Sequence, residues 1–231
     1  MPLYKNKHID WYRHLAFACV GGFFAAYAIL CRSGVMGNAQ TVNLLEMVID
    51  ALYGQGFKAL EHFGALVIYV AGTMMTVLLP YKWNVNMRRL SPVVTAAMAV
   101  VLSLLPAEMD LTLSLYPIFF AMSVQWSSFR GAQNFYSSTI FSTNNTKQTS
   151  LALAEYLCTR DRGQLKRAAF FGTTLLCFHI GAAMGVGAVH LLAIRGILLV
   201  LPLLVWAFFV VTQEEKAELL AAGEENREVA G

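Results

Sequence analysis

The chain has 231 residues, of which 57% are hydrophobic and only 13% are charged; its net charge is +3 and its mean hydropathy is +0.55. Soluble domains carry roughly 25% charged residues, so this composition excludes an ordinary soluble domain and favours a protein embedded in a membrane. No stretch is long and polar enough to form a separate soluble domain, so a single membrane domain is expected over residues 1–231.

Six apolar segments have about the length, ~17–25 residues, that a helix needs to cross a hydrocarbon core of ~30 Å. In chain order they are residues 15–31, 63–80, 90–106, 111–130, 168–190 and 196–212. The fourth is the least apolar, because serines and Gln125 interrupt it. The first has the basic flank of a signal peptide, but it is long for a cleavable segment and is expected to be retained. The prediction is an all-α membrane protein with six transmembrane helices.

Lysine and arginine are distributed unevenly between the two sides of this membrane. With the N-terminus in the cytoplasm, the cytoplasmic side receives Lys5, Lys7, Arg13, Lys82, Arg88, Arg89, Arg130, Lys147, Arg160, Arg162, Lys166, Arg167, Lys216 and Arg227. The other side receives only Arg32, Lys58 and Arg195. By the positive-inside rule, this bias predicts that both termini are cytoplasmic. The basic residues thus report topology and give no support to a nucleic-acid partner.

A short phrase occurs twice in the chain. Residues 41–46 read Thr-Val-Asn-Leu-Leu-Glu, and residues 143–148 read Thr-Asn-Asn-Thr-Lys-Gln. Each copy follows one apolar segment and precedes an amphipathic stretch and two further apolar segments. Because a unit of three spans is odd in number, consecutive units enter the bilayer from opposite sides, as in many secondary transporters. The prediction is two inverted three-helix repeats, residues 1–110 and 111–212, followed by a cytoplasmic tail at residues 213–231.

Both copies of the phrase have the spacing of a helix start. Asn43 with Glu46, and Asn145 with Gln148, place an N-cap acceptor three residues before an acid or an amide, as in a capping box. The helix after each copy is either an interfacial helix or the half-helix of a broken span. A helix N-terminus offers unpaired N–H groups and a partial positive charge, and two such ends from opposite faces would frame a site near the midplane. The alternative is that both copies only start helices.

The expected solute site is lined by Thr41, Asn43, Thr143 and Asn145, with Gln125 contributed by the fourth apolar segment. Polar side chains inside a membrane protein usually face its interior or a cavity, although hydrogen bonding between helices explains Gln125 equally well. No nucleophile triad, phosphate loop, metal cluster or cofactor fingerprint is present in the sequence. We therefore expect no catalytic residue, no metal site and no cofactor, and we do not expect an enzyme.

Other polar and small residues have simpler explanations. Glu46 and Asp50 lie one helical turn apart and could bind a cation or carry a proton. An exposed acidic face is favoured instead, because the second copy has Gln148 and Ala152 at those places. Close helix packing explains the small residues 181–185. The four cysteines form no Cys-x-x-Cys pair and are expected to be small buried hydrophobic residues.

Four phrases carry a resemblance to a known family. The first apolar segment contains Gly21-Gly22, and residues 35–43 read Val-Met-Gly-Asn-Ala-Gln-Thr-Val-Asn. Residues 122–125 read Met-Ser-Val-Gln, and residues 138–145 read Ser-Thr-Ile-Phe-Ser-Thr-Asn-Asn. These are similar to the Gly-rich first span and to the Ala-Gln-Thr-Gly-Asn, Met-Gly-x-Gln and Thr-x-x-Thr-Gly phrases of the YoaK family, small bacterial membrane proteins of unknown function. The resemblance covers nearly the whole chain.

The chain departs from that family's pattern at four positions. Val42 and Asn144 stand where a glycine usually follows the threonine, and Ser123 stands where a glycine precedes the glutamine. Ala25 occupies a position at which an acidic residue is common, so a proton-carrying step that used this acid would be missing here. The resemblance implies an integral protein of the bacterial cytoplasmic (inner) membrane and supplies no substrate.

These observations predict an integral membrane protein that binds or transports a small solute at the interface of two inverted repeats. Its expected partners are the lipid bilayer and an unidentified small solute, and a homodimer is plausible because six spans are few for a complete pathway. The rival interpretation is a membrane scaffold or accessory subunit, in which the phrases are helix caps and the Gly181 face docks a partner. A transporter needs a polar cavity lined by the phrase residues, whereas a scaffold needs a packed centre.

Overall fold

The structure is a computed structural model that describes residues 8–32 and 40–230. Almost all of this chain is helical, with one two-stranded antiparallel hairpin. The elements are α1 (Ile9–Cys31), α2 (Gln40–Leu52), α3 (Gly56–Trp83), α4 (Met87–Leu104), α5 (Leu111–Ser114), α6 (Tyr116–Ser128), β1 (Gly131–Ala132), β2 (Phe135–Tyr136), α7 (Thr143–Thr159), α8 (Arg162–Leu192), the 3-10 helix η2 (Ala193–Val200) and α9 (Leu201–Ala230). The all-α prediction is confirmed.

Four helical ranges of the described chain are long and apolar enough to cross a membrane: Ile9–Cys31, Gly56–Trp83, Met87–Leu104 and Arg162–Gly223. The last range contains the expected fifth and sixth spans, joined through η2. The expected fourth span is divided into α5 and α6, and α6 alone has only 13 residues. The chain is therefore a helical membrane protein, and its six-span count stays a prediction.

Burial separates a central helix from peripheral ones. In α1, 72% of the most apolar 18-residue window is buried inside the protein, against 11% in α3. The outer face of α3 exposes apolar side chains at helical spacing, namely Phe63, Val67, Val70, Met74 and Val77. An apolar face of this extent is unfavourable in water but matches the hydrocarbon of a bilayer.

Glycines allow α8 to approach α1 closely. A Cβ atom added at Gly22 would overlap the carbonyl oxygen of Phe178, and one added at Gly181 would overlap the carbonyl oxygen of Cys19. At Gly185 it would lie 2.8 Å from the carbonyl oxygen of Phe23. The predicted packing role of this small-residue face is confirmed. Because α1 of the same chain covers it, the face is not available to dock a partner.

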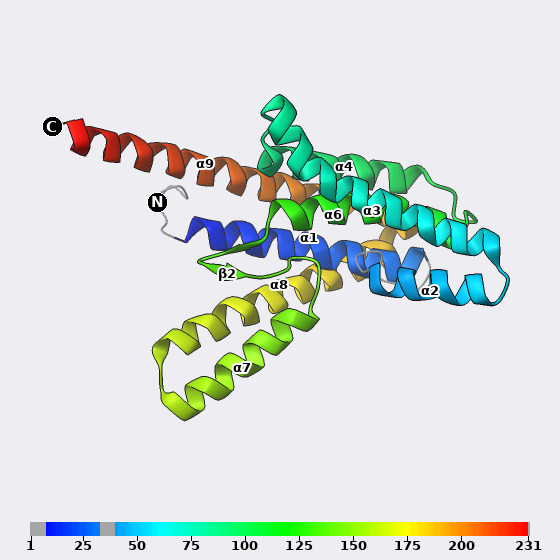
Figure 1. Cartoon of the computed structure of the whole chain (residues 1–231), viewed down its shortest axis with the longest axis horizontal. Coiled ribbons are helices and arrows are strands. Elements are labelled where there is room, and N and C mark those ends of the chain that lie inside the picture. The colour runs from blue at the N-terminus through cyan, green and yellow to red at the C-terminus, as the bar shows by residue number, and fades with distance from the viewer. Residues whose placement is uncertain (1–7, 33–39, 231) are drawn as a thin grey trace.

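The long helices run roughly along one axis, with both chain ends at the same end of the molecule (Figure 1). Helix α1 packs against α8 and α9, and α6 packs against α3 and α4. The shorter helices α2 and α7 both begin near the middle of the long axis (Figure 1). From there α2 runs to the end opposite the termini, whereas α7 runs towards the end at which α1 begins.

A hydrophobic core fills the space between α1, α4, α6 and η2. Its fully buried members include Phe24, Tyr27, Leu102, Ile118 and Met122. This core separates the two ends of the molecule, so polar groups gather in cavities at either end.

Candidate functional site

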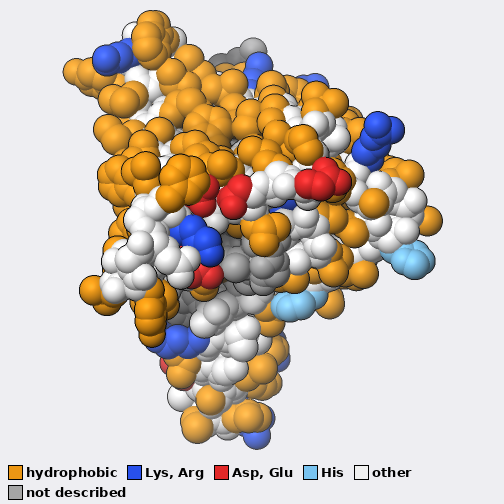
Figure 2. Space-filling view, turned by 90° about the vertical axis from the view of Figure 1, so that its right-hand side faces the viewer, with side chains coloured by type: hydrophobic (Ala, Val, Ile, Leu, Met, Phe, Trp, Pro, Cys, Tyr) orange, Lys and Arg blue, Asp and Glu red, His pale blue; other side chains and the backbone are white. Residues whose placement is uncertain are grey.

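A cavity of about 320 Å³ lies at the end of the molecule opposite the termini. Its lining, which we call the acidic cavity, consists of Asn43, Glu46, Asp50, Lys58, Glu61, His62, Asp110, Leu111, Thr112, Leu115 and Phe119. These residues come from α2, the first turns of α3, α5 with its N-cap, and α6. Figure 2 shows acidic side chains near the middle of this face, bordered by hydrophobic ones. Small-molecule sites typically have volumes of about 300–1,000 Å³, so the size fits a small solute.

Asn43 and His62 join the two helices that form the cavity wall. Asn43 is 2% exposed, and its Nδ2 atom donates to the main-chain oxygen of His62 at 2.9 Å. Its Oδ1 atom lies 2.9 Å from Nδ1 of His62. On the other side of the ring, Nε2 lies 3.4 Å from a carboxylate oxygen of Asp50, and Glu46 approaches Nδ1 at 3.9 Å. The imidazole is thus held between an amide and two carboxylates.

Glu61 and Asp110 are the remaining carboxylates of the acidic cavity. Glu61 is 8% exposed, and within the described residues its carboxylate has no hydrogen-bond or ion-pair partner. Its main-chain oxygen accepts a hydrogen bond from the Tyr116 hydroxyl at 2.7 Å, which fixes the turn that carries it. Asp110 is exposed and caps α5, accepting a hydrogen bond from the Leu113 amide at 3.0 Å.

The second copy of the phrase is bound to the segment that precedes it. Asn145 is 1% exposed; its Nδ2 atom donates to the main-chain oxygens of Ser138 at 2.9 Å and Phe141 at 3.2 Å. Its Oδ1 atom accepts from the Ser137 hydroxyl at 2.8 Å. Asn145 therefore fixes the path of residues 137–142 rather than presenting a free amide to a ligand.

Gln125 anchors the same segment from the side of α6. It is fully buried, and its Nε2 atom donates to the main-chain oxygen of Phe17 and to the hydroxyl of Thr139, both at 3.1 Å. Its Oε1 atom has no partner within the described chain. Gln125 thus joins α1, α6 and residues 137–142.

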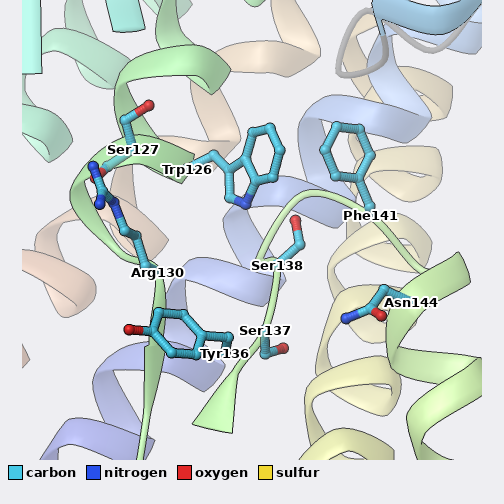
Figure 3. A pocket seen from close by; sticks show the side chains of 8 residues that line it. All are labelled: Trp126, Ser127, Arg130, Tyr136, Ser137, Ser138, Phe141 and Asn144. Atoms are coloured by element: carbon cyan, nitrogen blue, oxygen red, sulfur yellow. The ribbon is translucent and has the colours of Figure 1, made fainter.

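A second cavity, of about 430 Å³, opens beside this segment. Its lining is Trp126, Ser127, Arg130, Tyr136, Ser137, Ser138, Phe141 and Asn144. Figure 3 shows Trp126 and Phe141 across the gap from one another, with Arg130 and Tyr136 along another side. The rings of Trp126 and Phe141 meet edge to face, with centroids 5.2 Å apart. Most of this lining is aromatic or neutral, with a single arginine.

Ion pairs join three helices at the end of the molecule at which α1 begins. Arg13 of α1 donates to a carboxylate oxygen of Glu214 at 2.5 Å and to the main-chain oxygen of Gly131 at 2.7 Å. Arg88 of α4 forms two hydrogen bonds with Glu218, at 2.7 and 2.9 Å. Arg89 pairs with Glu215 at 2.6 Å. Helices α1 and α4 are thus both tied to α9, beside a charged cavity of about 700 Å³.

The residues predicted to line one site lie in different surroundings. Asn43 lines the acidic cavity, whereas Thr41 is exposed. Thr143 is exposed and lines a further cavity of about 480 Å³ between α1, α7 and α8. Gln125 and Asn145 both form hydrogen bonds with the segment of residues 137–142. Asn43 lies instead in the separate helical hairpin of α2 and α3.

The predicted capping boxes are wrong. Asn43 lies inside α2, which begins at Gln40, and Asn145 lies inside α7, which has Ser142 as its N-cap. Their amide groups bond to His62 and to the segment before α7 instead of to the N–H groups of their own first turns. A buried amide with main-chain acceptors nearby is better satisfied there than at an exposed helix end.

Sequence reasoning missed most of the acidic cavity. Glu46 and Asp50 do share a helix face, but the side chain of Asp50 is only 16% exposed because it faces His62. The helical spacing of those two acids was the available signal. No sequence signal placed Glu61 and Asp110 beside each other, because the distance between them depends on how α5 packs against α3.

Metal-ion coordination has little support in the described chain. Among the side chains of residues 8–32 and 40–223, no three from His, Cys, Asp or Glu are placed to hold one ion. All four cysteines are free thiols, and three of them are partly buried, close to the expected small hydrophobic role.

Comparison with known proteins gives a family but no function. A family model described as "Protein of unknown function (DUF1275)" matches residues 14–211. No curated protein and no solved structure matches the chain.

Proposed function

We propose that this chain, which belongs to the DUF1275 family of proteins of unknown function, binds a small solute in the acidic cavity and carries it across the membrane. The observation that carries the proposal is the cavity itself: a polar recess of solute size, built around the short helix α2 in an otherwise apolar protein. Polar groups are costly inside membrane proteins and usually mark paths for solutes, ions or protons.

Two inverted repeats are part of the proposal. The packing of α1 against α8 and α9 parallels that of α6 against α3 and α4, as expected if α1–α4 correspond to α6–α9. The half-helices α2 and α7 then occupy equivalent positions and run in opposite directions from the middle of the molecule (Figure 1). Transporters built in this way expose one central site to each side in turn by rocking one repeat against the other.

The positive-inside bias of lysine and arginine sets the orientation of the proposed transporter in a bacterial inner membrane. With both termini in the cytoplasm, the acidic cavity faces outwards, and the ion pairs of Arg13, Arg88 and Arg89 join α1 and α4 to α9 on the cytoplasmic side.

The hydrophobic core favours the rival function of a scaffold or accessory subunit. Phe24, Ile118 and Met122 pack in the hydrophobic core at the centre. A carrier has such a closed centre in each of its end states, whereas a scaffold has it always. Binding of a solute separates the two functions.

A thermal-shift screen of the purified protein in detergent tests solute binding. The panel contains amino acids, amines, sugars, nucleosides, carboxylates and inorganic ions, because a ligand of the folded state raises its apparent stability. The parent is compared with an Asp50→Asn/Glu61→Gln variant and with Glu108→Gln, an exposed acid outside the cavity. A shift in the parent and the Glu108→Gln control that the double variant loses supports the proposal. A panel without any shift favours the scaffold.

A further inference from the structure

We infer that the acidic cavity takes an organic cation: one or two ammonium groups on a short hydrocarbon chain. This inference rests on the proposed solute-binding function of the same cavity and names the class of solute. The lining contributes the carboxylates of Glu46, Asp50, Glu61 and Asp110. Against them stand the ammonium of Lys58 and the imidazole of His62. Even with His62 protonated, the carboxylates are in excess.

Glu61 is the carboxylate of the acidic cavity whose surroundings most favour a bound cation. It is more than nine-tenths buried at the cavity wall and has no hydrogen-bond or ion-pair partner within the described chain. Its carboxylate therefore faces the cavity, where protein surrounds most of the residue and no described cation is bonded to it, so a cation of the ligand can bind there. An ammonium group bound between Glu61 and Asp110 would form charge-assisted hydrogen bonds with both carboxylates.

A bare metal ion fits this cavity less well. Asp50 and Glu46 already face the ring of His62, at 3.4 and 3.9 Å. No three metal-binding side chains of the described residues converge on one point, as a coordinated ion demands. Separate carboxylates around a recess instead match a ligand whose positive charge is spread along a chain.

The remaining lining suits the hydrocarbon part of such a ligand. Leu111, Leu115 and Phe119 form an apolar wall, with the hydroxyl of Thr112 beside it. Leu115 is 4% exposed and Phe119 is 1% exposed, so these two side chains belong to the packed core, whereas Leu111 is 52% exposed at the rim. A ligand that combined ammonium groups with a few methylene groups would satisfy both halves of a cavity of about 320 Å³.

Isothermal titration calorimetry in detergent with three four-carbon probes tests the class. The probes are 1,4-diaminobutane, 1,4-butanediol and succinate, which share a chain length and differ in charge; magnesium chloride is titrated separately. We expect the diamine to bind at least about tenfold more tightly than the other three, a difference of about 1.4 kcal/mol. Its affinity should fall as sodium chloride is raised, because exposed charges are screened.

Variants locate the binding. Glu61→Gln and Asp110→Asn should each weaken diamine binding about tenfold or more, and Glu108→Gln, two residues from Asp110 but outside the cavity, should not. Asp110 is exposed, so its variant keeps the test valid if Glu61→Gln folds poorly.

Two results would overturn the inference: no heat from the diamine at millimolar concentration, or diamine binding that survives both cavity variants. If the diol, succinate or another solute of the panel binds and needs these residues, the solute class is wrong while solute binding stands. If the whole panel is also silent, the proposed function falls with it.

Discussion

Asn43 and His62 are joined twice, by the amide Nδ2 to the main-chain oxygen of His62 and by Oδ1 to the ring nitrogen Nδ1, each at 2.9 Å. This pair ties the first copy of the repeated phrase to the start of α3. The two residues are 19 positions apart in the chain, and their contact forms the wall from which the carboxylates of the acidic cavity project.

Removal of this amide should destabilise the α2–α3 hairpin. Asn43→Ala leaves the buried oxygen of His62 without its donor, so the free energy of unfolding should fall by about 1–3 kcal/mol. Thr41→Ala, at an exposed site in the same turn, should change it by no more than about 0.5 kcal/mol. Unfolding in detergent titrated with SDS measures both, and equal losses would show that Asn43 has no special role.

Arg32 should be required for the end of α4. Its guanidinium is 1% exposed and donates to the main-chain oxygens of Pro106, Leu102 and Leu105 at 2.8, 3.0 and 3.2 Å. Arg32→Met removes these charge-assisted bonds from the carbonyls that a helix end leaves unpaired, and should cost about 1.5–3 kcal/mol. The matched control is Arg195→Met, at an exposed arginine on the same predicted side. The interpretation fails if thermal unfolding midpoints of the two variants coincide.

The contact between α1 and α8 should depend on glycine at one position and not at another. Gly181→Ala places a methyl group against the carbonyl oxygen of Cys19, and such overpacking typically costs about 1–3 kcal/mol. Gly187→Ala, in the same helix, meets nothing within 4 Å and should stabilise by about 0.5–1 kcal/mol. Opposite shifts of the unfolding midpoint are therefore expected, and a rise with both variants would disprove the close approach.

The ion pairs should differ in importance according to their burial. The side chains of Arg13 and Glu214 are 10% and 6% exposed, whereas those of Arg88 and Glu218 are 36% and 51% exposed. Glu214→Gln leaves Arg13 charged and buried, so a loss of about 3–5 kcal/mol is expected. Glu218→Gln breaks an exposed pair and should cost about 0–1 kcal/mol. Losses of similar size, compared in low and high salt, would contradict this ranking.

The sequence predicted the all-α class and the start of the two shorter helices α2 and α7, and for a physical reason. A helix that crosses a bilayer must be apolar along its whole length. Its position can therefore be recognised from one continuous stretch of the sequence. Helices α2 and α7 begin within a few residues of the positions that Thr41 and Thr143 indicated. The small residues around Gly181 likewise predicted a close contact between helices.

The partners of the polar residues could not be predicted in this way. Arg13 and Glu214 are separated by 201 residues, and Gln125 and Phe17 by 108, so only the packing of the helices brings them together. The acidic cavity depends on the same kind of contact between α2, α3 and α5. The break of the fourth apolar segment into α5 and α6 had a local signal that the prediction of a continuous span overlooked, namely Pro117 in the first turn of α6.

Flux through proteoliposomes is the most direct test of solute transport. Vesicles that contain the parent, Glu61→Gln or Glu108→Gln are loaded with unlabelled 1,4-diaminobutane, or with any other solute that shifts the unfolding midpoint, and diluted into labelled solute. Transport predicts transient accumulation of label with the parent and with Glu108→Gln, and none with Glu61→Gln. Label that never exceeds the level in protein-free vesicles, for a solute that the parent binds, would contradict transport and leave a binding protein or scaffold.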